Sequence, residues 1–318
     1  MVKYDVITFG SAVVDVYVSG DIFDKGKDIC VPSGAKLLID KLRFSVGGGG
    51  TNTAASFATF GLKTAYFGKI GVGSNAEIIL KELRKDKVDF IGVQSKEETG
   101  YSIILDSKNH NRTVLTHKGA NDFIEKKDIQ INNLNSKWFY FSTLMKKSFR
   151  TQLDIAKYGN KKGIKIAYNP SQYQIENEKS HVKNILKFTD VLIFNKEEAE
   201  LLVGKKNVFE NIHKLGPKIV CVTDGKNGGV VSDGIYTYKY GAHKEIKVVE
   251  RTGAGDAFAS GFITGIIKNK TIEDCIQIGL ANSESVIQKP GAKNGLLNLS
   301  QAMNKIKNHP VRIEKRKK

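Results

Sequence analysis

The sequence predicts an α/β fold in which a mostly parallel sheet is covered by helices on both faces. Short apolar runs alternate with amphipathic stretches along the chain, which is the pattern of repeated βαβ units. The apolar runs are continuous, as expected for strands that are buried on both faces of a sheet. These strand-like runs are Val6–Phe9, Thr64–Ile70, Lys137–Ser142, Ile164–Tyr168, Val191–Phe194 and Ile219–Thr223.

The amphipathic stretches between these runs predict helices. Thr53–Phe60 ends at Gly61, and Lys196–Val203 ends at Gly204. A glycine directly after a helical stretch is the usual left-handed C-cap. Ser74–Leu83 places its isoleucines and its last leucine on one face, so that face is expected to pack on the sheet.

Two stretches interrupt the α/β pattern and predict a small β lid attached to the core. Residues 12–45 contain no clear helical periodicity. In the second stretch, Tyr101–Leu105 and Thr113–Thr116 flank the polar turn Asp106–Arg112, as in a hairpin. We expect one domain over residues 1–318, with the lid formed by about 12–45 and 98–118.

Composition excludes several classes of protein. Of 318 residues, 40% are hydrophobic and 26% are charged, which is enough apolar material for a sizeable core. No apolar run approaches the roughly 20 residues that a membrane span needs, and the N-terminus has no signal-peptide pattern. Cys30, Cys221 and Cys275 are far apart, and the histidines form no HExxH pair, so no zinc site is expected. We therefore expect reduced thiols and a cytoplasmic location.

The chain is strongly basic, with 50 Lys and Arg against 33 Asp and Glu, for a net charge of +17. Such a charge suits either nucleic acid or small anionic substrates. The basic residues are scattered and no RNP-like aromatic motif is present, so we expect no specific nucleic-acid partner. Residues 310–318 form a basic C-terminal tail, and we expect Arg312–Lys318 to be frayed and solvated.

The strongest chemical signal is the stretch Glu250–Phe258, which reads ERTGAGDAF. It follows the β-like run Glu245–Val249 and precedes the apolar helical stretch Ala257–Ile267. A turn made by Gly253, Ala254 and Gly255 lets backbone N–H groups point outward at a helix N-terminus, where they can bind an anion. Asp256 would repel that anion, so it is better explained as a base that takes a proton from a hydroxyl. The alternative is an aspartate that merely stabilises the first turn of its helix.

Two further elements suit a polyhydroxylated ligand. The glycine cluster Gly47–Gly50, with Gly48 and Gly49 at its centre, allows a ligand to approach the backbone, and Asn52 offers both a donor and an acceptor. Asp15 lies just beyond the first strand, where ligands bind in open α/β sheets. The alternatives are a flexible linker for the glycines and an ordinary turn for Asp15.

Two more elements follow apolar strands. Asn195 and Glu198 come after Val191–Phe194; Asn195 is a good helix cap, and Glu198 could orient a hydrated Mg²⁺. Thr223–Gly229 is either a turn that passes under a nucleotide or a hairpin loop. The sequence thus predicts five polar or glycine-rich elements at the carboxyl ends of successive strands.

These residues resemble the ribokinase-like carbohydrate kinases, the PfkB family. The resemblance covers nearly the whole chain in order, and the Gly-Ala-Gly-Asp turn followed by Ala-Phe is its most specific part. It is carried by Gly10–Asp15, the glycines up to Asn52, Asn195–Glu198, Gly253–Asp256 and Ser285–Leu296.

The resemblance implies ATP-dependent phosphorylation of a sugar hydroxyl in a three-layer α/β/α domain with a β lid that closes over the site. Asp256 would be the general base, and an anion hole would be formed by Gly253, Ala254 and Gly255. The acceptor would be held by Asp15, Gly48, Gly49 and Asn52. The nucleotide would be bound by Asn195, Thr223, Gly225, Gly228 and Asn282. Mg²⁺ would be held through water by Glu198, and lid-mediated homodimers are a further implication.

The chain departs from the family pattern at two positions. Glu250 stands where the family often has an Asp that helps bind a monovalent cation, so potassium activation is left open. Gly49 stands where ribokinases proper often carry Lys, which weakens an assignment to ribose. There is no GxxxxGK[ST] stretch, which excludes a P-loop kinase.

Other functions remain open at this point. A nucleoside kinase or a sugar-phosphate kinase of the same family is possible, and Lys118 or Arg112 could supply a cation for a phosphorylated acceptor. Outside the family, Gly71–Ala76 matches the dinucleotide fingerprint GxGxxG/A of an NAD-dependent oxidoreductase. That interpretation leaves the other glycine-rich motifs unexplained.

Overall fold

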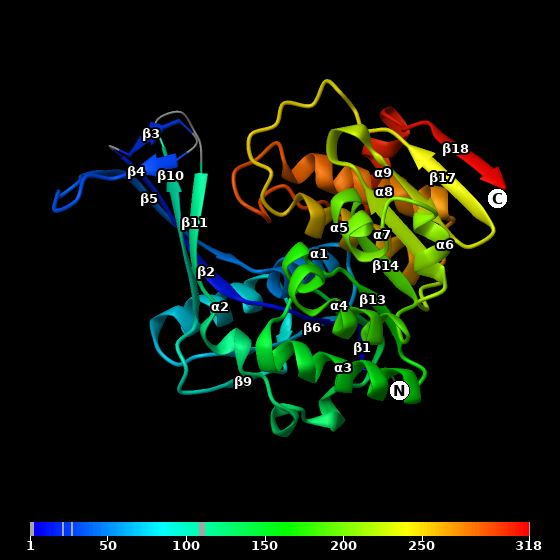
Figure 1. Cartoon of the computed structure of the whole chain (residues 1–318), viewed down its shortest axis with the longest axis horizontal. Coiled ribbons are helices and arrows are strands. Elements are labelled where there is room, and N and C mark those ends of the chain that lie inside the picture. The colour runs from blue at the N-terminus through cyan, green and yellow to red at the C-terminus, as the bar shows by residue number, and fades with distance from the viewer. Residues whose placement is uncertain (1–2, 21, 27, 108–111, 318) are drawn as a thin grey trace.

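A sheet of mostly parallel strands runs through the middle of the molecule in this computed structural model, which describes residues 3–20, 22–26, 28–107 and 112–317 (Figure 1). From one edge, the strand order is β8-β6-β1-β12-β13-β14-β15-β16-β17-β18. The strands from β8 to β15 are parallel, and those from β15 to β18 are antiparallel. Their bounds are β1 Tyr4–Phe9, β6 Thr64–Phe67, β8 Asp89–Phe90, β12 Ser136–Phe141, β13 Lys165–Tyr168, β14 Val191–Asn195, β15 Ile219–Thr223, β16 Gly229–Ser232, β17 Tyr236–Tyr240 and β18 Ile313–Lys317.

Helices cover both faces of this sheet, so the predicted fold class is confirmed. One face packs mainly on α3, α4, α5 and α6, and the other on α1, α7 and α8. The helices are α1 Gly49–Thr59, α2 Ser74–Lys85, α3 Lys146–Lys161, α4 Gln172–Leu186, α5 Lys196–Val203, α6 Val208–His213, α7 Ala254–Ile267, α8 Ile272–Val286 and α9 Leu299–Asn308. Short 3₁₀ turns lie at Gly119–Asp122, Lys126–Asp128, Ile131–Asn133 and Gly225–Asn227. No helix in the described ranges is long and apolar enough to cross a membrane.

The predicted strands and helices lie close to their expected bounds. Thr64–Ile70 divides into β6 and the short strand β7, Lys69–Ile70, which pairs with β9, Val93–Gln94. Helix α1 begins at Gly49, four residues before the predicted start, because the glycine cluster itself enters the first turn. The predicted flexible linker is therefore wrong for Gly49 and Gly50.

A smaller sheet stands beside the core, where the sequence predicts β structure, and we call it the lid sheet (Figure 1). Its order is β11-β10-β2-β5. The strands are β2 Val13–Gly20, β5 Ile39–Gly47, β10 Gly100–Asp106 and β11 Arg112–His117, and a short ribbon joins β3 Phe23–Lys25 to β4 Asp28–Cys30. The hairpin of β10 and β11 is confirmed, although Asp106 and Arg112 belong to its strands and residues 108–111 of the expected turn lie outside the described ranges.

The predicted strand over Glu245–Val249 is wrong. Val248 and Val249 are about half exposed, and the backbone N–H groups of Val249 and Glu250 donate to the carbonyl of Ile287. The apolar run cannot extend the sheet beside β17, because that edge is already paired with β18.

The predicted frayed tail is also wrong. Ile313–Lys317 forms β18, which pairs antiparallel with β17 over its whole length. Ile313 packs on the core beneath α7 and α8, and the Lys315 ammonium lies 4.6 Å from the centre of the Tyr236 ring. The basic residues of this segment are therefore the exposed positions of an edge strand, which is a common way to discourage further pairing.

Removal of residues 312–318 is expected to destabilise the protein, because it deletes a strand and exposes apolar surface on β17. Loss of about 1–2 kcal/mol corresponds to a fall in Tm of about 2–3 °C for a chain of this length, which thermal unfolding can measure. The matched control replaces Arg316 and Lys317 with Gln, which keeps the strand while removing two exposed charges. Equal Tm values for the truncated, control and unchanged chains would contradict the packed strand.

Candidate active site

The N-termini of two helices meet beside the carboxyl end of β1. Helix α1 packs along α7, and the Ser260 hydroxyl donates to the Ser56 hydroxyl across 2.6 Å. At the start of both helices, the Asn52 amide donates to Asp256 Oδ2 at 2.9 Å. Because backbone N–H groups in the first turn of a helix have no intrahelical acceptor, this junction carries partial positive charge from both helices.

Two glycines allow these helices to begin where they do. A Cβ on Gly50 would lie 2.7 Å from the carbonyl carbon of Gly10 and 2.6 Å from the Tyr66 ring. Gly253, the N-cap of α7, has φ 80° and lies so close to Ala292 that a Cβ would meet the Ala292 Cβ at 2.6 Å. A larger residue at either position would force the backbone to move, so the glycines fix the approach of the two helices.

Asp256 combines a partly buried carboxylate with one neutral hydrogen-bond donor, the Asn52 amide. Burial raises the pKa of Asp256 to about 6, and the hydrogen bond from Asn52 opposes that rise. The other side-chain atom of Asn52, Oδ1, is buried without a hydrogen-bond partner. Gly49 is the close neighbour on the other side, since a Cβ there would lie 3.7 Å from Asp256 Oδ1. The site thus pairs a potential base with an acceptor that a ligand hydroxyl can satisfy.

The turn before α7 offers N–H groups, but not the three that the sequence predicts. The N–H of Ala254 donates to the Arg251 carbonyl at 3.2 Å and is used within the turn. The N–H groups of Gly255 and Asp256 lie in the first helical turn, where the helix itself supplies no acceptor. Within this turn, the N–H groups that the helix leaves available to an anion are therefore those of Gly255 and Asp256, whereas that of Ala254 is already bonded.

Asp15 faces this junction from the lid sheet. It lies in β2, and its carboxylate covers Gly47 so closely that a Cβ there would collide with Oδ2. Burial raises the pKa of Asp15, while the Ser102 hydroxyl and the charge of Lys118 lower it. Because Asp15 belongs to the lid and Asp256 to the core, the candidate site spans both.

The remaining predicted residues are held by the fold itself. Asn195 and Glu198 cap α5 reciprocally: Asn195 Oδ1 accepts from the Glu198 N–H, and Glu198 Oε2 accepts from the Asn195 N–H, both at 2.8 Å. Glu198 Oε1 also accepts from the Gln172 N–H at 3.1 Å. Only 9% of Glu198 is exposed, and this burial raises the pKa of its carboxylate.

Thr223 ends β15, and Gly225 and Gly228 lie in the turn that joins it to β16. This turn is a hairpin loop, as the alternative interpretation holds, and Gly225 is exposed at its tip. Asn282 is fully buried: it donates to Ser56 and to the Ala257 carbonyl, and it accepts from the Leu297 N–H. Asn282 therefore braces α1, α7 and α8 from inside and is not open to a nucleotide.

The expectation that all five elements follow strands is wrong for one of them, and the other four do not share one sheet. Gly10, Asn195 and Thr223 lie at the carboxyl ends of β1, β14 and β15. Gly48 instead follows lid strand β5, and Gly253 follows a segment that is not a strand. Sequence analysis also missed Ser142, directly after β12, whose hydroxyl lies 2.8 Å from where a Gly49 Cβ would be. Its position after a strand was the available signal.

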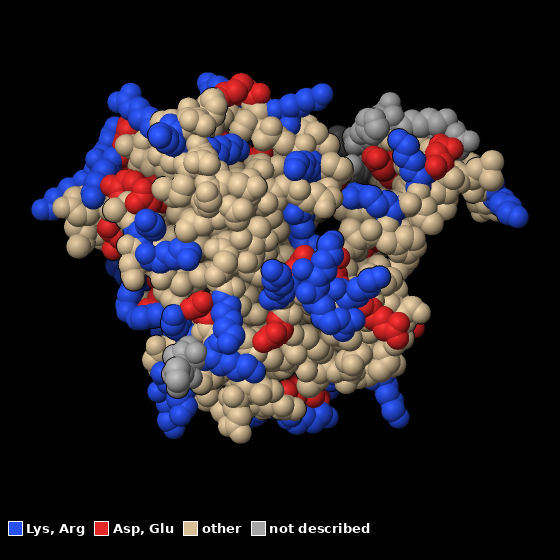
Figure 2. All heavy atoms as spheres, turned by 180° about the vertical axis from the view of Figure 1, so that it is seen from behind, with Lys and Arg blue, Asp and Glu red and all other residues tan. Residues whose placement is uncertain are grey.

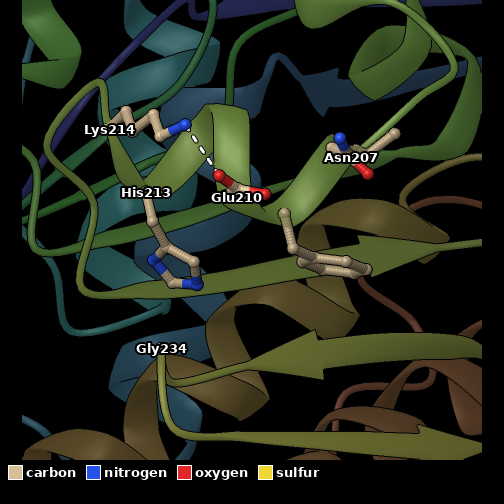
Figure 3. A pocket seen from close by; sticks show the side chains of 7 residues that line it. Asn207, Glu210, His213, Lys214 and Gly234 are labelled. Atoms are coloured by element: carbon tan, nitrogen blue, oxygen red, sulfur yellow. Dashed lines mark hydrogen bonds and ion pairs between the residues drawn. The ribbon is translucent and has the colours of Figure 1, made fainter. Parts of the chain in front are cut away.

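Surface features elsewhere do not compete with this site. A shallow pocket of about 650 Å³ lies beside α6 and is lined by Asn207, Glu210, His213 and Lys214 among others, none of them a predicted site residue (Figure 3). The His213 ring bonds the Pro217 carbonyl and the Ser232 hydroxyl, so its nitrogens serve the fold. On the face seen from behind, Lys and Arg are spread widely with Asp and Glu among them, as the scattered basic residues predict (Figure 2).

Comparison with known proteins decides the family. The family model described as pfkB family carbohydrate kinase matches residues 4–298. The chain belongs to this family. It is an ATP-dependent sugar kinase, a phosphotransferase that acts on a hydroxyl group. The dehydrogenase interpretation of Gly71–Ala76 is thereby set aside, and that stretch simply opens α2.

Relatives and solved structures agree with this family. An ATP-dependent 6-phosphofructokinase of Thermoanaerobacterium thermosaccharolyticum is 26% identical over 91% of this chain and 90% of its own length. A ribokinase of Lactococcus lactis is 29% identical over 84% of this chain and 87% of its own. By fold, the ribokinase from Thermotoga maritima superposes with a TM-score of 0.83 at 22% identity, covering 96% of this chain and all of its own. The Arabidopsis thaliana ribokinase complexed with ribose and ATP superposes with a TM-score of 0.82 at 21% identity, covering 95% of this chain and 98% of its own.

The hydrogen bond from Asn52 makes a specific prediction about Asp256. Replacing Asn52 with Ala is expected to raise the pKa of Asp256 above 6, because the group that favours the ionised carboxylate is lost while its burial remains. NMR titration of the Asp256 carboxyl carbon, assigned by its absence in Asp256→Asn, measures the shift. The control is Thr59→Ala on the same helix, which removes only a hydrogen bond to the Ala55 carbonyl. An unchanged or lowered pKa in Asn52→Ala would show that the bond does not control Asp256.

Proposed function

We propose that this kinase transfers the γ-phosphate of ATP to a hydroxyl of a small sugar held between the lid sheet and the N-termini of α1 and α7. The observation that carries the proposal is the position of Asp256, in the first turn of α7 and bonded to Asn52. A carboxylate whose pKa is about 6 is mostly ionised at neutral pH, yet it is basic enough to take a proton as the reaction proceeds.

In the proposed reaction, Asp256 accepts the proton of the acceptor hydroxyl as that oxygen attacks the γ-phosphorus. The new bond joins the acceptor oxygen to phosphorus, the bond to the β–γ bridging oxygen breaks, and ADP leaves with that electron pair. The N–H groups of Gly255 and Asp256, in the first turn of α7, stabilise negative charge on the phosphoryl oxygens. Such transfers depend mainly on positioning and charge stabilisation, which the rigid helix N-termini supply.

On the acceptor side, we assign substrate binding to Asp15, Gly48, Gly49 and Asn52. Asp15 accepts hydrogen bonds from sugar hydroxyls, and Asn52 Oδ1 has an open lone pair for another. Gly48 and Gly49 leave room for the acceptor close to the backbone. The Arabidopsis thaliana ribokinase complexed with ribose and ATP, which shares this fold, supports a sugar as the acceptor.

On the nucleotide side, we assign Asn195, Thr223, Gly225 and Gly228, with Asn282 acting from behind by bracing the helices. ATP implies a divalent cation, which we propose is Mg²⁺. Both oxygens of Glu198 already accept backbone N–H groups, so this carboxylate fits a metal held through water better than direct coordination. Mg²⁺ would neutralise charge on the phosphates.

The test is an ATP-consumption screen across ribose, fructose, nucleosides and sugar phosphates, with product detection by mass. We expect turnover with a free sugar, an acidic limb near pH 6 from Asp256, and a fall in kcat of about 10²–10⁴-fold in Asp256→Asn with little change in the KM for ATP.

The matched control for this screen is Asp274→Asn, because Asp274 occupies the first turn of α8 as Asp256 does in α7. Near-normal kcat in Asp256→Asn would remove the base assignment. Turnover with nucleosides or sugar phosphates alone would replace the free sugar by one of those classes.

We further propose that the protein is cytoplasmic, where ATP is available and where its free thiols stay reduced. We also propose that two copies pair through the outer face of the lid sheet. On that face, Leu42 and Phe44 of β5 and Leu115 of β11 are each more than half exposed. Cross-strand pairing places Val16 and Ile103 between them on the same face, where Val16 is buried in the core cluster that includes residues of α2. The exposed apolar residues of this face therefore lie on the two outer strands, β5 and β11.

Phe44→Lys is expected to shift the protein from dimer toward monomer, since it puts a charge into the proposed interface. Sedimentation velocity across a concentration series measures the shift. The control is Ile235→Lys, which changes an equally exposed apolar residue outside the lid. A protein that is monomeric at all concentrations before mutation would contradict the lid-mediated dimer.

A further inference from the structure

Arg43 reaches from the lid sheet to the core. It lies in β5 directly across from Tyr17 of β2, and its guanidinium lies over the Tyr17 ring, 3.9 Å from the ring centre. Its Nη2 is 3.8 Å from Glu250 Oε2, so one side chain contacts an aromatic residue of the lid and a carboxylate of the core. Its side chain is 39% exposed, whereas that of Glu250 is 1% exposed.

Glu250 is connected in turn to the anion-binding turn. Glu250 Oε2 accepts the N–H of Gly291 at 2.8 Å. The next residue, Ala292, is the one that packs against Gly253 at the N-cap of α7. Glu250 itself precedes Gly253 by three residues. The path from Arg43 through Glu250 and the Gly291–Ala292 segment to Gly253 is therefore made of direct contacts.

An arginine at position 43 is suited to making both contacts of this path, with Tyr17 and with Glu250. A guanidinium is planar and always charged, so it can stack on a ring and face a carboxylate at the same time, which a lysine ammonium does less well. Asp15 lies on the same face of β2 as Tyr17, two residues away. Anything that fixes Tyr17 and Arg43 relative to the core therefore also fixes the acceptor-binding carboxylate.

We propose that Arg43 is a positioning residue that sets the spacing between Asp15 on the lid and the anion-binding turn at Gly253–Asp256. The inference rests on the proposed function, because it assigns the acceptor to the lid side and the phosphate to the turn. Phosphoryl transfer requires the attacking oxygen and the γ-phosphorus to be aligned, and small displacements lower the rate strongly. Arg43 acts on the rate through Glu250 and Tyr17, without touching the reacting atoms.

The kinetic test compares Arg43→Met with Lys41→Met. Lys41 lies two residues away on the same strand and face and carries the same charge, but it is exposed and pairs with Ser19 at the outer part of the lid. Arg43→Met is expected to lower kcat by about 10–100-fold and to raise the KM for the acceptor, with the KM for ATP changed by less than about twofold. Lys41→Met is expected to keep the kinetics of the unchanged protein.

A rescue experiment separates positioning from general damage to the fold. In Arg43→Ala, added guanidinium ion is expected to raise kcat at least about tenfold above its value without the ion. Sodium at the same ionic strength is expected to leave kcat unchanged. The kcat of the double variant, Arg43→Met with Glu250→Gln, is expected to equal that of whichever single variant has the lower kcat. The effects should not add, because both changes break the same path.

Amide hydrogen exchange gives a readout that needs no turnover. Exchange at Ile39–Gly47 and at Gly291 is expected to accelerate in Arg43→Met and to stay unchanged in Lys41→Met. Equal kinetics in the two Met variants, absent guanidinium rescue or unchanged exchange would each overturn the positioning role. Failure of the unchanged protein to phosphorylate any acceptor would instead overturn the proposed function, and the exchange result would still decide whether Arg43 ties the lid to the core.

Discussion

The contact between Asn52 and Asp256 is the point on which the arrangement of the site depends. It joins the first turns of α1 and α7, and those turns can meet only because Gly50 lies against Gly10 and Gly253 lies against Ala292. The same contact sets the chemistry, since burial raises the pKa of Asp256 and the Asn52 amide restrains that rise. One hydrogen bond thus fixes the relative position of two helices and the protonation of the carboxylate between them.

This arrangement costs stability at neutral pH. The pKa of Asp256 is raised to about 6 from an ordinary 3.8, so the folded state binds a proton that the unfolded state releases more readily. Its contribution to stability is full below the unfolded-state pKa and is lost as the pH rises through about 6. The buried contacts around it, such as the Ser56, Ser260 and Asn282 network, hold the helices together against this penalty. If Asp256 is the base, as proposed, this loss of stability accompanies a carboxylate whose pKa lies near the working pH.

Sequence patterns predicted those parts of the molecule that local physics determines. Continuous apolar runs predicted the central strands, and the Gly-Ala-Gly-Asp turn predicted the start of α7, because burial and helix geometry act within a few residues. The errors arose where distant partners decide. The valines near Val248 resemble a strand, but β18 already pairs with β17. Asn282 was expected near a nucleotide, yet its partners Ser56 and Leu297 enclose it from separate parts of the chain. The use of the Ala254 N–H inside its own turn likewise depends on a geometry that residue types alone do not specify.

The division of the site between lid and core makes the acceptor specificity separable from the phosphate chemistry. Asp256 and the turn at α7 belong to the core, whereas Asp15, Tyr17 and Arg43 belong to strands of the lid sheet. Under the proposed function, substitutions in the lid can therefore change which hydroxyl is presented without altering Asp256, the proposed base. Such a division requires a connection that keeps the two parts in register, because a mobile lid alone would present the acceptor at variable distance. The buried carboxylate of Glu250 meets that requirement from the core side, since it lies next to the turn that faces the phosphate and within reach of an arginine from the lid.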